Sequence, residues 1–164
     1  DGIPTKEKLK ILNKENNFPL ELQEIVYKLK QIYTQENFSM KCLPSFSQEY
    51  LMQKLKQNNI KIAVASNSIR ATVGLAMENL HLTEYIEFFL SNEDVSKGKP
   101  DPEIYTKAIK MLGLQPSDCL VVEDNFNGIK AALDAGAHLL RVDEVDDVNH
   151  LNVMNRISEI NQEI

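Results

Sequence analysis

Several features are scarce in these 164 residues, and each scarcity narrows the class of protein. The two cysteines, Cys42 and Cys119, lie far apart and show no metal-ligand spacing. We therefore expect no disulfide framework and no cysteine-bound metal, and a reducing, cytoplasmic setting fits best. No apolar run approaches the roughly 18 residues of a membrane span, and no signal-peptide pattern is present. The expected protein has no membrane partner.

Basic residues are also in the minority. The chain has 18 Lys and Arg against 24 Asp and Glu, for a formal net charge of −6. Nucleic-acid-binding proteins usually carry a basic face, so no nucleic-acid partner is expected. The lysines between Lys6 and Lys30 alternate with glutamates, which is typical of a solvated helix surface.

Two regions differ in pattern and predict two domains. Residues 1–42 contain two predicted helices, over 6–12 and 20–35, and form a partial helical domain. Residues 43–164 alternate between helices and short apolar strands. The predicted strands are 61–65, 88–90, 119–122 and 138–142, and the predicted helices are 48–58, 69–80, 102–112, an Ala-rich segment closed by Gly136, and 148–161. This alternation with short connections predicts an α/β fold with a parallel sheet.

Two polar segments are candidates for binding an anion. Ser66 and Asn67 follow a predicted strand and precede a helix, where a hydroxyl and free N–H groups form an anion site. Helix capping by Ser66 and Asn67 is the alternative. Lys99 lies in a loop stiffened by Pro100 and Pro102, where a fixed positive charge neutralises a phosphate or a developing charge. The alternative is a surface lysine in a turn.

A third segment places two adjacent carboxylates, Glu123 and Asp124, directly after a predicted buried strand. The carboxyl ends of parallel strands are where open α/β sheets carry their chemistry. Paired carboxylates offer the oxygen ligands that Mg²⁺ prefers. The alternative is a helix start at which acids complement the helix dipole.

In combination, the segments GKPDPEIY and VVEDNFNGIKAALDAG, preceded by Ser66-Asn67, resemble the haloacid dehalogenase superfamily of phosphohydrolases and phosphomutases. The resemblance implies a Rossmann-like core with a small all-α cap, as in the β-phosphoglucomutase-like branch. Site roles follow from it as expectations: phosphoryl binding by Ser66, Asn67 and Lys99, catalysis by Ser66 and Lys99, Mg²⁺ binding by Glu123 and Asp124, and leaving-group contacts by Thr5, Lys30 and Arg70.

The sequence departs from the family at its first motif, an apolar strand that ends in an Asp-x-Asp-Gly-Thr-like segment and supplies the nucleophile. Asp1-Gly2 imitates its last letters, but no apolar strand precedes it, so Asp1 is interpreted as a cap residue. In the family this strand is central. We therefore expect an upstream segment or a partner strand to complete the sheet between the strands that end at Ser66 and Asp124.

The function implied by the resemblance is a Mg²⁺-dependent phosphatase of a small phosphorylated metabolite. It would act through an aspartyl-phosphate on a nucleophile upstream of this chain, so the chain alone is expected to be inactive. One alternative is a sugar phosphomutase of the β-phosphoglucomutase type, which uses the same groups. The other is a catalytically inactive domain that binds phosphate and metal.

Overall fold

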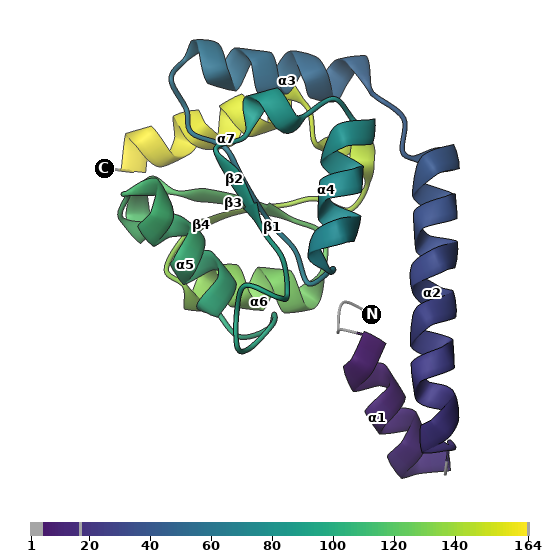
Figure 1. The fold of residues 1–164 in the computed structure, drawn as a ribbon. Coiled ribbons are helices and arrows are strands. Elements are labelled where there is room, and N and C mark those ends of the chain that lie inside the picture. Colours follow the sequence, from purple (N-terminus) through teal and green to yellow (C-terminus); the bar gives the residue numbers. More distant parts are fainter. Residues whose placement is uncertain (1–4, 17, 164) are drawn as a thin grey trace.

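The computed structural model describes residues 5–16 and 18–163, and Figure 1 shows their arrangement. Its helices are α1 (Thr5–Asn16), α2 (Leu20–Lys41), α3 (Phe46–Gln57), α4 (Arg70–Asn79), α5 (Glu103–Leu112), α6 (Phe126–Asp134) and α7 (His150–Glu163). Its strands are β1 (Ala63–Ala65), β2 (Phe88–Leu90), β3 (Leu120–Glu123) and β4 (His138–Arg141). From α3 onward helices and strands alternate, as the sequence pattern predicts.

The predicted elements are present, with shifts at their ends. The helix predicted over residues 20–35 extends to Lys41, because no proline or glycine occurs before Pro44 to end it. The strand predicted over residues 61–65 is shorter and pairs only from Ala63 to Ala65. Asp1 lies outside the described residues.

The strands form two parallel pairs. β1 pairs with β2, with Ala65 opposite Leu90, and β3 pairs with β4, with Glu123 opposite Arg141. Within residues 5–16 and 18–163, no backbone ladder joins β1 to β3. Each of these two strands therefore keeps an open edge, and the parallel sheet is interrupted where the sequence predicts a missing central strand.

Helices cover the strands on two sides (Figure 1). α5 and α6 lie on one side, where Ile104, Ala131 and Ala132 are completely buried. The alanine side chains of α6 are small, so this helix approaches the strands closely. α3 and α7 lie on the other side, with a core of Leu51, Leu55 and Val153. Burying one such large aliphatic side chain stabilises the fold by about 1.5–3 kcal/mol.

α1 and α2 lie beside the strand-bearing region, and α2 contacts α4 (Figure 1). Four apolar side chains that recur at helical spacing on α2 are exposed: Leu22, Ile25, Leu29 and Ile32. The segment from residue 42 to residue 45 has no helix or strand and connects α2 to α3. The division of the chain into two domains at residue 42 stays a prediction.

Both cysteines are free thiols and half-buried in the structure. Cys119 directly precedes β3 rather than lying within it. None of the helices in the described part of the chain has the length and apolar character needed to cross a membrane.

Candidate functional site

The centre of the site is a buried ion pair between Lys99 and Glu123. Lys99 lies in the loop between β2 and α5, and Glu123 is the last residue of β3. The Lys99 ammonium donates to the Glu123 carboxylate and, at 2.9 Å, to the backbone carbonyl of Ala65, the last residue of β1. The lysine therefore connects the carboxyl ends of the two strands that no ladder joins.

The Glu123 carboxylate is fully engaged by its surroundings. Besides Lys99, its Oε1 accepts a 2.6 Å hydrogen bond from the Tyr105 hydroxyl, and its Oε2 accepts from the backbone N–H groups of Asp124 and Asn125. Burial raises the pKa of Glu123, but the Lys99 charge and these hydrogen bonds outweigh burial and hold the pKa below its usual value. Glu123 therefore stays ionised and balances the buried lysine.

Tyr105 completes the cluster from α5. The centre of its ring lies 4.7 Å from the Lys99 ammonium nitrogen, within cation–π range. Burial and the hydrogen bond to Glu123 raise the pKa of Tyr105 well above its usual value. Tyr105 was not singled out from the sequence. In the sequence, Tyr105 could have been found as a hydroxyl-bearing aromatic residue on the apolar face of an amphipathic helix, beside Ile104 and Ala108.

Ser66 directly follows β1 and is held by the strand pairing. Its backbone N–H donates to Leu90 at 2.9 Å, and its hydroxyl accepts from the backbone N–H of Ser68 at 3.1 Å. The N-cap of α4 is Ile69, which makes no side-chain cap. The capping alternative for Ser66 and Asn67 is therefore wrong. Ser66 directly follows Ala65, whose carbonyl accepts from Lys99.

The Asn67 side chain binds the main chain of Lys99, so the first and second predicted segments meet directly. The sequence assigned Asn67 a phosphate-binding role through its backbone N–H, and that role stays a prediction. The side-chain contact to Lys99 was not predicted, because it joins residues 32 positions apart across two loops.

Asp124 is exposed at the carboxyl end of β3, in the turn that leads into α6. Asn125, not Asp124, is the helix N-cap, since its side-chain oxygen accepts from the backbone N–H of Asn127. The predicted Mg²⁺ site is thus divided: Asp124 is accessible, whereas Lys99 and Tyr105 occupy Glu123. In the described part of the chain, no group of three His, Cys, Asp or Glu side chains is placed to hold a metal.

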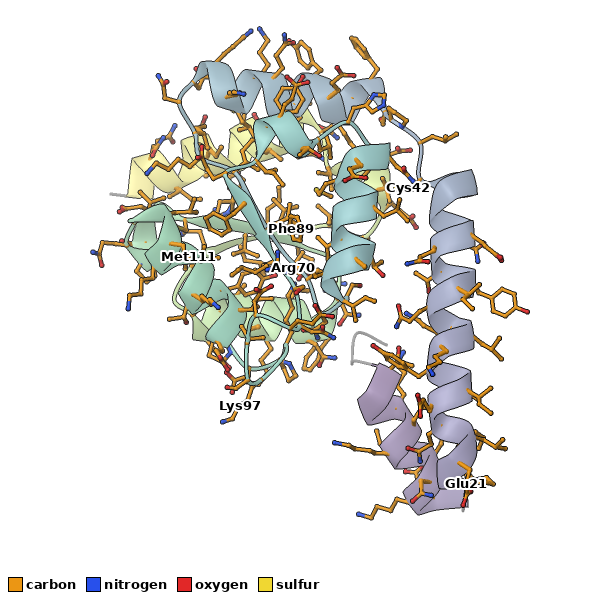
Figure 2. All side chains as sticks on the ribbon, in the orientation of Figure 1. Glu21, Cys42, Arg70, Phe89, Lys97 and Met111 are labelled. Carbon is orange, nitrogen blue, oxygen red and sulfur yellow. The ribbon has the colours of Figure 1, made fainter. Side chains whose placement is uncertain are left out.

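Of the three predicted leaving-group contacts, Arg70 has the clearest setting. Its guanidinium binds the Asp94 carboxylate and lies 5.2 Å from the Phe89 ring centre (Figure 2). Arg70 and Phe89 line a cleft of about 600 Å³ between α2 and α4, with Gln35 contributed by α2. Thr5 at the start of α1 and Lys30 in α2 are not among its lining residues, and their roles stay predictions.

Asp94 joins the loop after β2 to the start of α4. Besides Arg70, its carboxylate accepts hydrogen bonds from the backbone N–H and hydroxyl of Ser91, at 2.8 and 2.7 Å, and Ser91 is fully buried. The Ser91 hydrogen bonds, with the Arg70 contact, lower the pKa of Asp94 to about 2. The carboxylate is therefore more stable in the folded protein than in the unfolded chain.

We expect Asp94→Asn to lower the free energy of unfolding at pH 7 by about 2 kcal/mol. Because the pKa of Asp94 is lower in the folded protein, the carboxylate contributes its full stability above its unfolded-state pKa, near 3.8. That contribution is lost as the pH falls through the folded-state pKa of about 2. The difference between wild type and variant should thus shrink as the pH is lowered from 4 to 2. Urea unfolding at several pH values measures it. A difference that stays constant across this range would contradict the assignment.

The fold and the strand-end cluster together define an α/β protein of the class that carries its polar groups at the carboxyl ends of parallel strands. A sequence model of the haloacid dehalogenase-like hydrolases matches residues 6–136. The chain belongs to the haloacid dehalogenase-like hydrolase family.

Curated relatives include phosphatases. The chain is 29% identical over 158 residues to a bifunctional riboflavin kinase/FMN phosphatase of Arabidopsis thaliana, covering 89% of this chain and 41% of that protein. It is 28% identical over 138 residues to a phosphorylated carbohydrates phosphatase of Thermotoga maritima, covering 82% and 62%. The chain therefore spans less than two thirds of the length of either relative.

Solved structures support the fold. The β-phosphoglucomutase from Clostridium difficile superposes with a TM-score of 0.77 at 24% identity, covering 96% of this chain and 78% of that one. A hydrolase from Pseudomonas syringae superposes with a TM-score of 0.75 at 23% identity, covering 97% and 79%. These likenesses confirm the α/β fold class and the β-phosphoglucomutase-like architecture predicted from the sequence.

Proposed function

We propose that this chain contributes the phosphoryl-binding half of a Mg²⁺-dependent phosphatase that acts on a small phosphorylated metabolite. One observation carries the proposal. The buried Lys99 ammonium lies at the carboxyl ends of both β1 and β3, bound to Ala65 and Glu123. Ser66 and Asp124 are the next residues along the chain after these two strands. Three separate segments thus bring a cation, a hydroxyl and a carboxylate to one end of the sheet.

Each group has a distinct chemical task in this proposal. The Lys99 ammonium and the Ser66 hydroxyl stabilise the negative charge on the phosphoryl oxygens, assisted by the backbone N–H of Asn67. Phosphoryl transfer depends mainly on such positioning and electrostatics. Glu123 and Tyr105 hold the lysine in place, because three other donors fix the Glu123 carboxylate and leave the ammonium little freedom.

The proposed nucleophile is an aspartate on a strand that fills the break between β1 and β3. Its carboxylate oxygen bonds to phosphorus as the bond from phosphorus to the substrate oxygen breaks, and the released alkoxide takes a proton to become an alcohol. Water then attacks the aspartyl-phosphate, releasing inorganic phosphate and regenerating the carboxylate. The 164-residue chain without this strand is proposed to be inactive.

Of the two predicted Mg²⁺ ligands, Asp124 is the one proposed to bind the metal directly. An exposed carboxylate at a strand end suits a hard cation, and Asp124 would hold Mg²⁺ together with carboxylates of the proposed strand. Glu123 fits less well as a direct ligand, because its oxygens already bind Lys99, Tyr105 and backbone N–H groups. When bound, the cation would neutralise charge on the phosphoryl group.

Residues 1–42 are proposed to form part of a cap over the site, with residues 43–164 as the core. Such a cap would exclude water and select the substrate. The cleft between α2 and α4 supports this division, because it places Arg70 of the core opposite Gln35 of α2. The relatives named for phosphorylated carbohydrates and FMN favour a phosphomonoester of a small polar molecule as substrate.

The test is an assay of p-nitrophenyl phosphate hydrolysis, with and without Mg²⁺, using a polypeptide that continues upstream through the proposed strand and its following helix. We expect Mg²⁺-dependent turnover from this polypeptide and none from the 164-residue chain. Asp124→Asn should weaken the apparent Mg²⁺ affinity by at least about tenfold, because it removes a charged ligand.

Cys119→Ser is the matched control, because it changes a half-buried residue that directly precedes the other end of the same strand. It should alter stability and leave the Mg²⁺ dependence unchanged. The absence of turnover by a folded extended polypeptide would refute the enzymatic proposal. An Asp124→Asn variant with wild-type Mg²⁺ dependence would refute the metal assignment alone.

A further inference from the structure

The side-chain amide of Asn67 holds the main chain of Lys99 by two hydrogen bonds. Its Nδ2 donates to the Lys99 carbonyl at 3.0 Å, and its Oδ1 accepts from the Lys99 N–H at 2.9 Å. Asparagine is the shortest side chain that carries a donor and an acceptor on one planar group. It therefore satisfies both backbone groups of a single residue, as a neighbouring strand would.

Lys99 needs such a contact because its backbone belongs to no regular element. It lies in the loop between β2 and α5, and neither a helix nor a strand ladder holds that loop at residues 96–102. The side chain of Lys99 nevertheless reaches two defined partners, Ala65 and Glu123. A lysine side chain has four rotatable bonds, so its ammonium stays at one point only if its backbone is also fixed.

Gly98 shows how closely the two loops fit. A Cβ built on Gly98 would lie 2.8 Å from Oδ1 of Asn67, and its three nearest atoms all belong to the Asn67 side chain. The backbone of Gly98 is not in the left-handed region, so alanine is conformationally allowed there. The Asn67 amide is consequently the first obstacle to a side chain at this position, and it cannot retreat without breaking its bonds to Lys99.

We infer that Asn67 is a positioning residue for Lys99, an inference that rests on the proposed phosphatase function and adds a new role within it. The amide holds the Lys99 backbone so that the ammonium remains at the ends of β1 and β3. This role belongs to the side chain and is separate from the phosphate contact assigned to the Asn67 backbone N–H.

Four variants of the extended polypeptide test the inference: Asn67→Asp, Asn67→Ala, Gly98→Ala and the double variant Asn67→Ala/Gly98→Ala. Asn67→Asp is isosteric, but it turns a carboxylate oxygen toward the Lys99 carbonyl in place of a donor. We expect kcat to fall by at least about tenfold, with a smaller change in KM, because the ammonium acts on charge that develops in the transition state.

Asn149→Ala is the matched control. Its amide also makes two hydrogen bonds to the backbone, donating to the Asp146 carbonyl at 2.8 Å and accepting from the Asn152 N–H at 3.0 Å. These bonds lie at the start of α7 and do not involve Lys99. Asn149→Ala should therefore lower the urea midpoint as Asn67→Ala does and leave kcat unchanged.

The Gly98 variants give a readout that needs no activity. Gly98→Ala alone should raise the unfolding equilibrium constant by about tenfold, as an overpacked contact does. In the Asn67→Ala background, Gly98→Ala should raise the unfolding equilibrium constant by less than about threefold. The obstructing amide is gone, so the effects of the two substitutions are coupled.

The outcomes separate the two proposals. Equal costs of Gly98→Ala in both backgrounds, or a wild-type kcat for Asn67→Asp, would overturn the positioning role. If the extended wild-type polypeptide shows no turnover, the proposed function fails by itself. The coupling between Asn67 and Gly98 then decides the inference, and additive costs overturn it.

Discussion

Gly128→Ala is expected to lower the free energy of unfolding by about 2–4 kcal/mol, although alanine is the better helix former. Gly128 lies in the first turn of α6, and a Cβ there would overlap the carboxylate of Glu123. The alanine gains about 0.5–1 kcal/mol of helix propensity. Displacing Glu123 separates it from Lys99 and Tyr105, and breaking a buried ion pair costs about 3–5 kcal/mol. The second effect is larger, so the variant is destabilised.

Gly74→Ala is the matched control for this prediction. Gly74 also lies within a helix, α4, but a Cβ there meets only the Phe89 ring, at the ordinary contact distance of 3.7 Å. This variant should be stabilised by about 0.5–1 kcal/mol, since only helix propensity changes. Urea unfolding followed by circular dichroism measures both. If both variants change stability in the same direction, the Glu123 carboxylate does not occupy the space beside Gly128.

Lys99→Met is expected to be destabilised by about 3–5 kcal/mol, because it leaves the Glu123 carboxylate buried without its cation. Methionine has nearly the length of lysine, so the packing against Tyr105 changes little. The double variant Lys99→Met/Glu123→Gln should recover most of the lost stability, since the neutral amide of glutamine needs no counter-charge. In the extended polypeptide, both the single and the double variant should lack the proposed phosphatase activity, because the Lys99 ammonium is absent.

Lys97→Met controls for the loss of a lysine from the same loop. The side chain of Lys97 is 74% exposed and lies 3.8 Å from Asp101, and Figure 2 shows it projecting from the loop. A solvent-exposed pair of this kind contributes only about 0–1 kcal/mol, so this variant should unfold almost as the wild type does. Equal losses from Lys97→Met and Lys99→Met would contradict a buried ion pair at the centre of the site.

The helices and strands were largely predictable because they depend on neighbours in the sequence. The helix predicted over residues 102–112 is present as α5, and the structure shows Ile104, Tyr105 and Ala108 on its buried face. The ends were less predictable. The helix predicted to stop at residue 35 extends to Lys41, since its polar last turns carry no helix-ending residue.

The candidate site was predicted in its residue types and order but not in its pairing. Ser66, Lys99 and the two acids were chosen because they follow strands or lie in a stiff loop. Their roles stay predictions, but the structure brings Lys99 and Glu123 into direct contact. The sequence assigned both Glu123 and Asp124 to the predicted Mg²⁺ site. In the structure one is buried against a lysine and the other is exposed.

The sequence by itself determined the family and the alternation of helices and strands, because local patterns and chain order encode these features. Only the tertiary structure decided which groups face each other. The Asn67 contact with Lys99, the Tyr105 contact with Glu123 and the space beside Gly128 all join segments far apart in the chain. Such contacts depend on how helices and strands pack, and no local spacing specifies that.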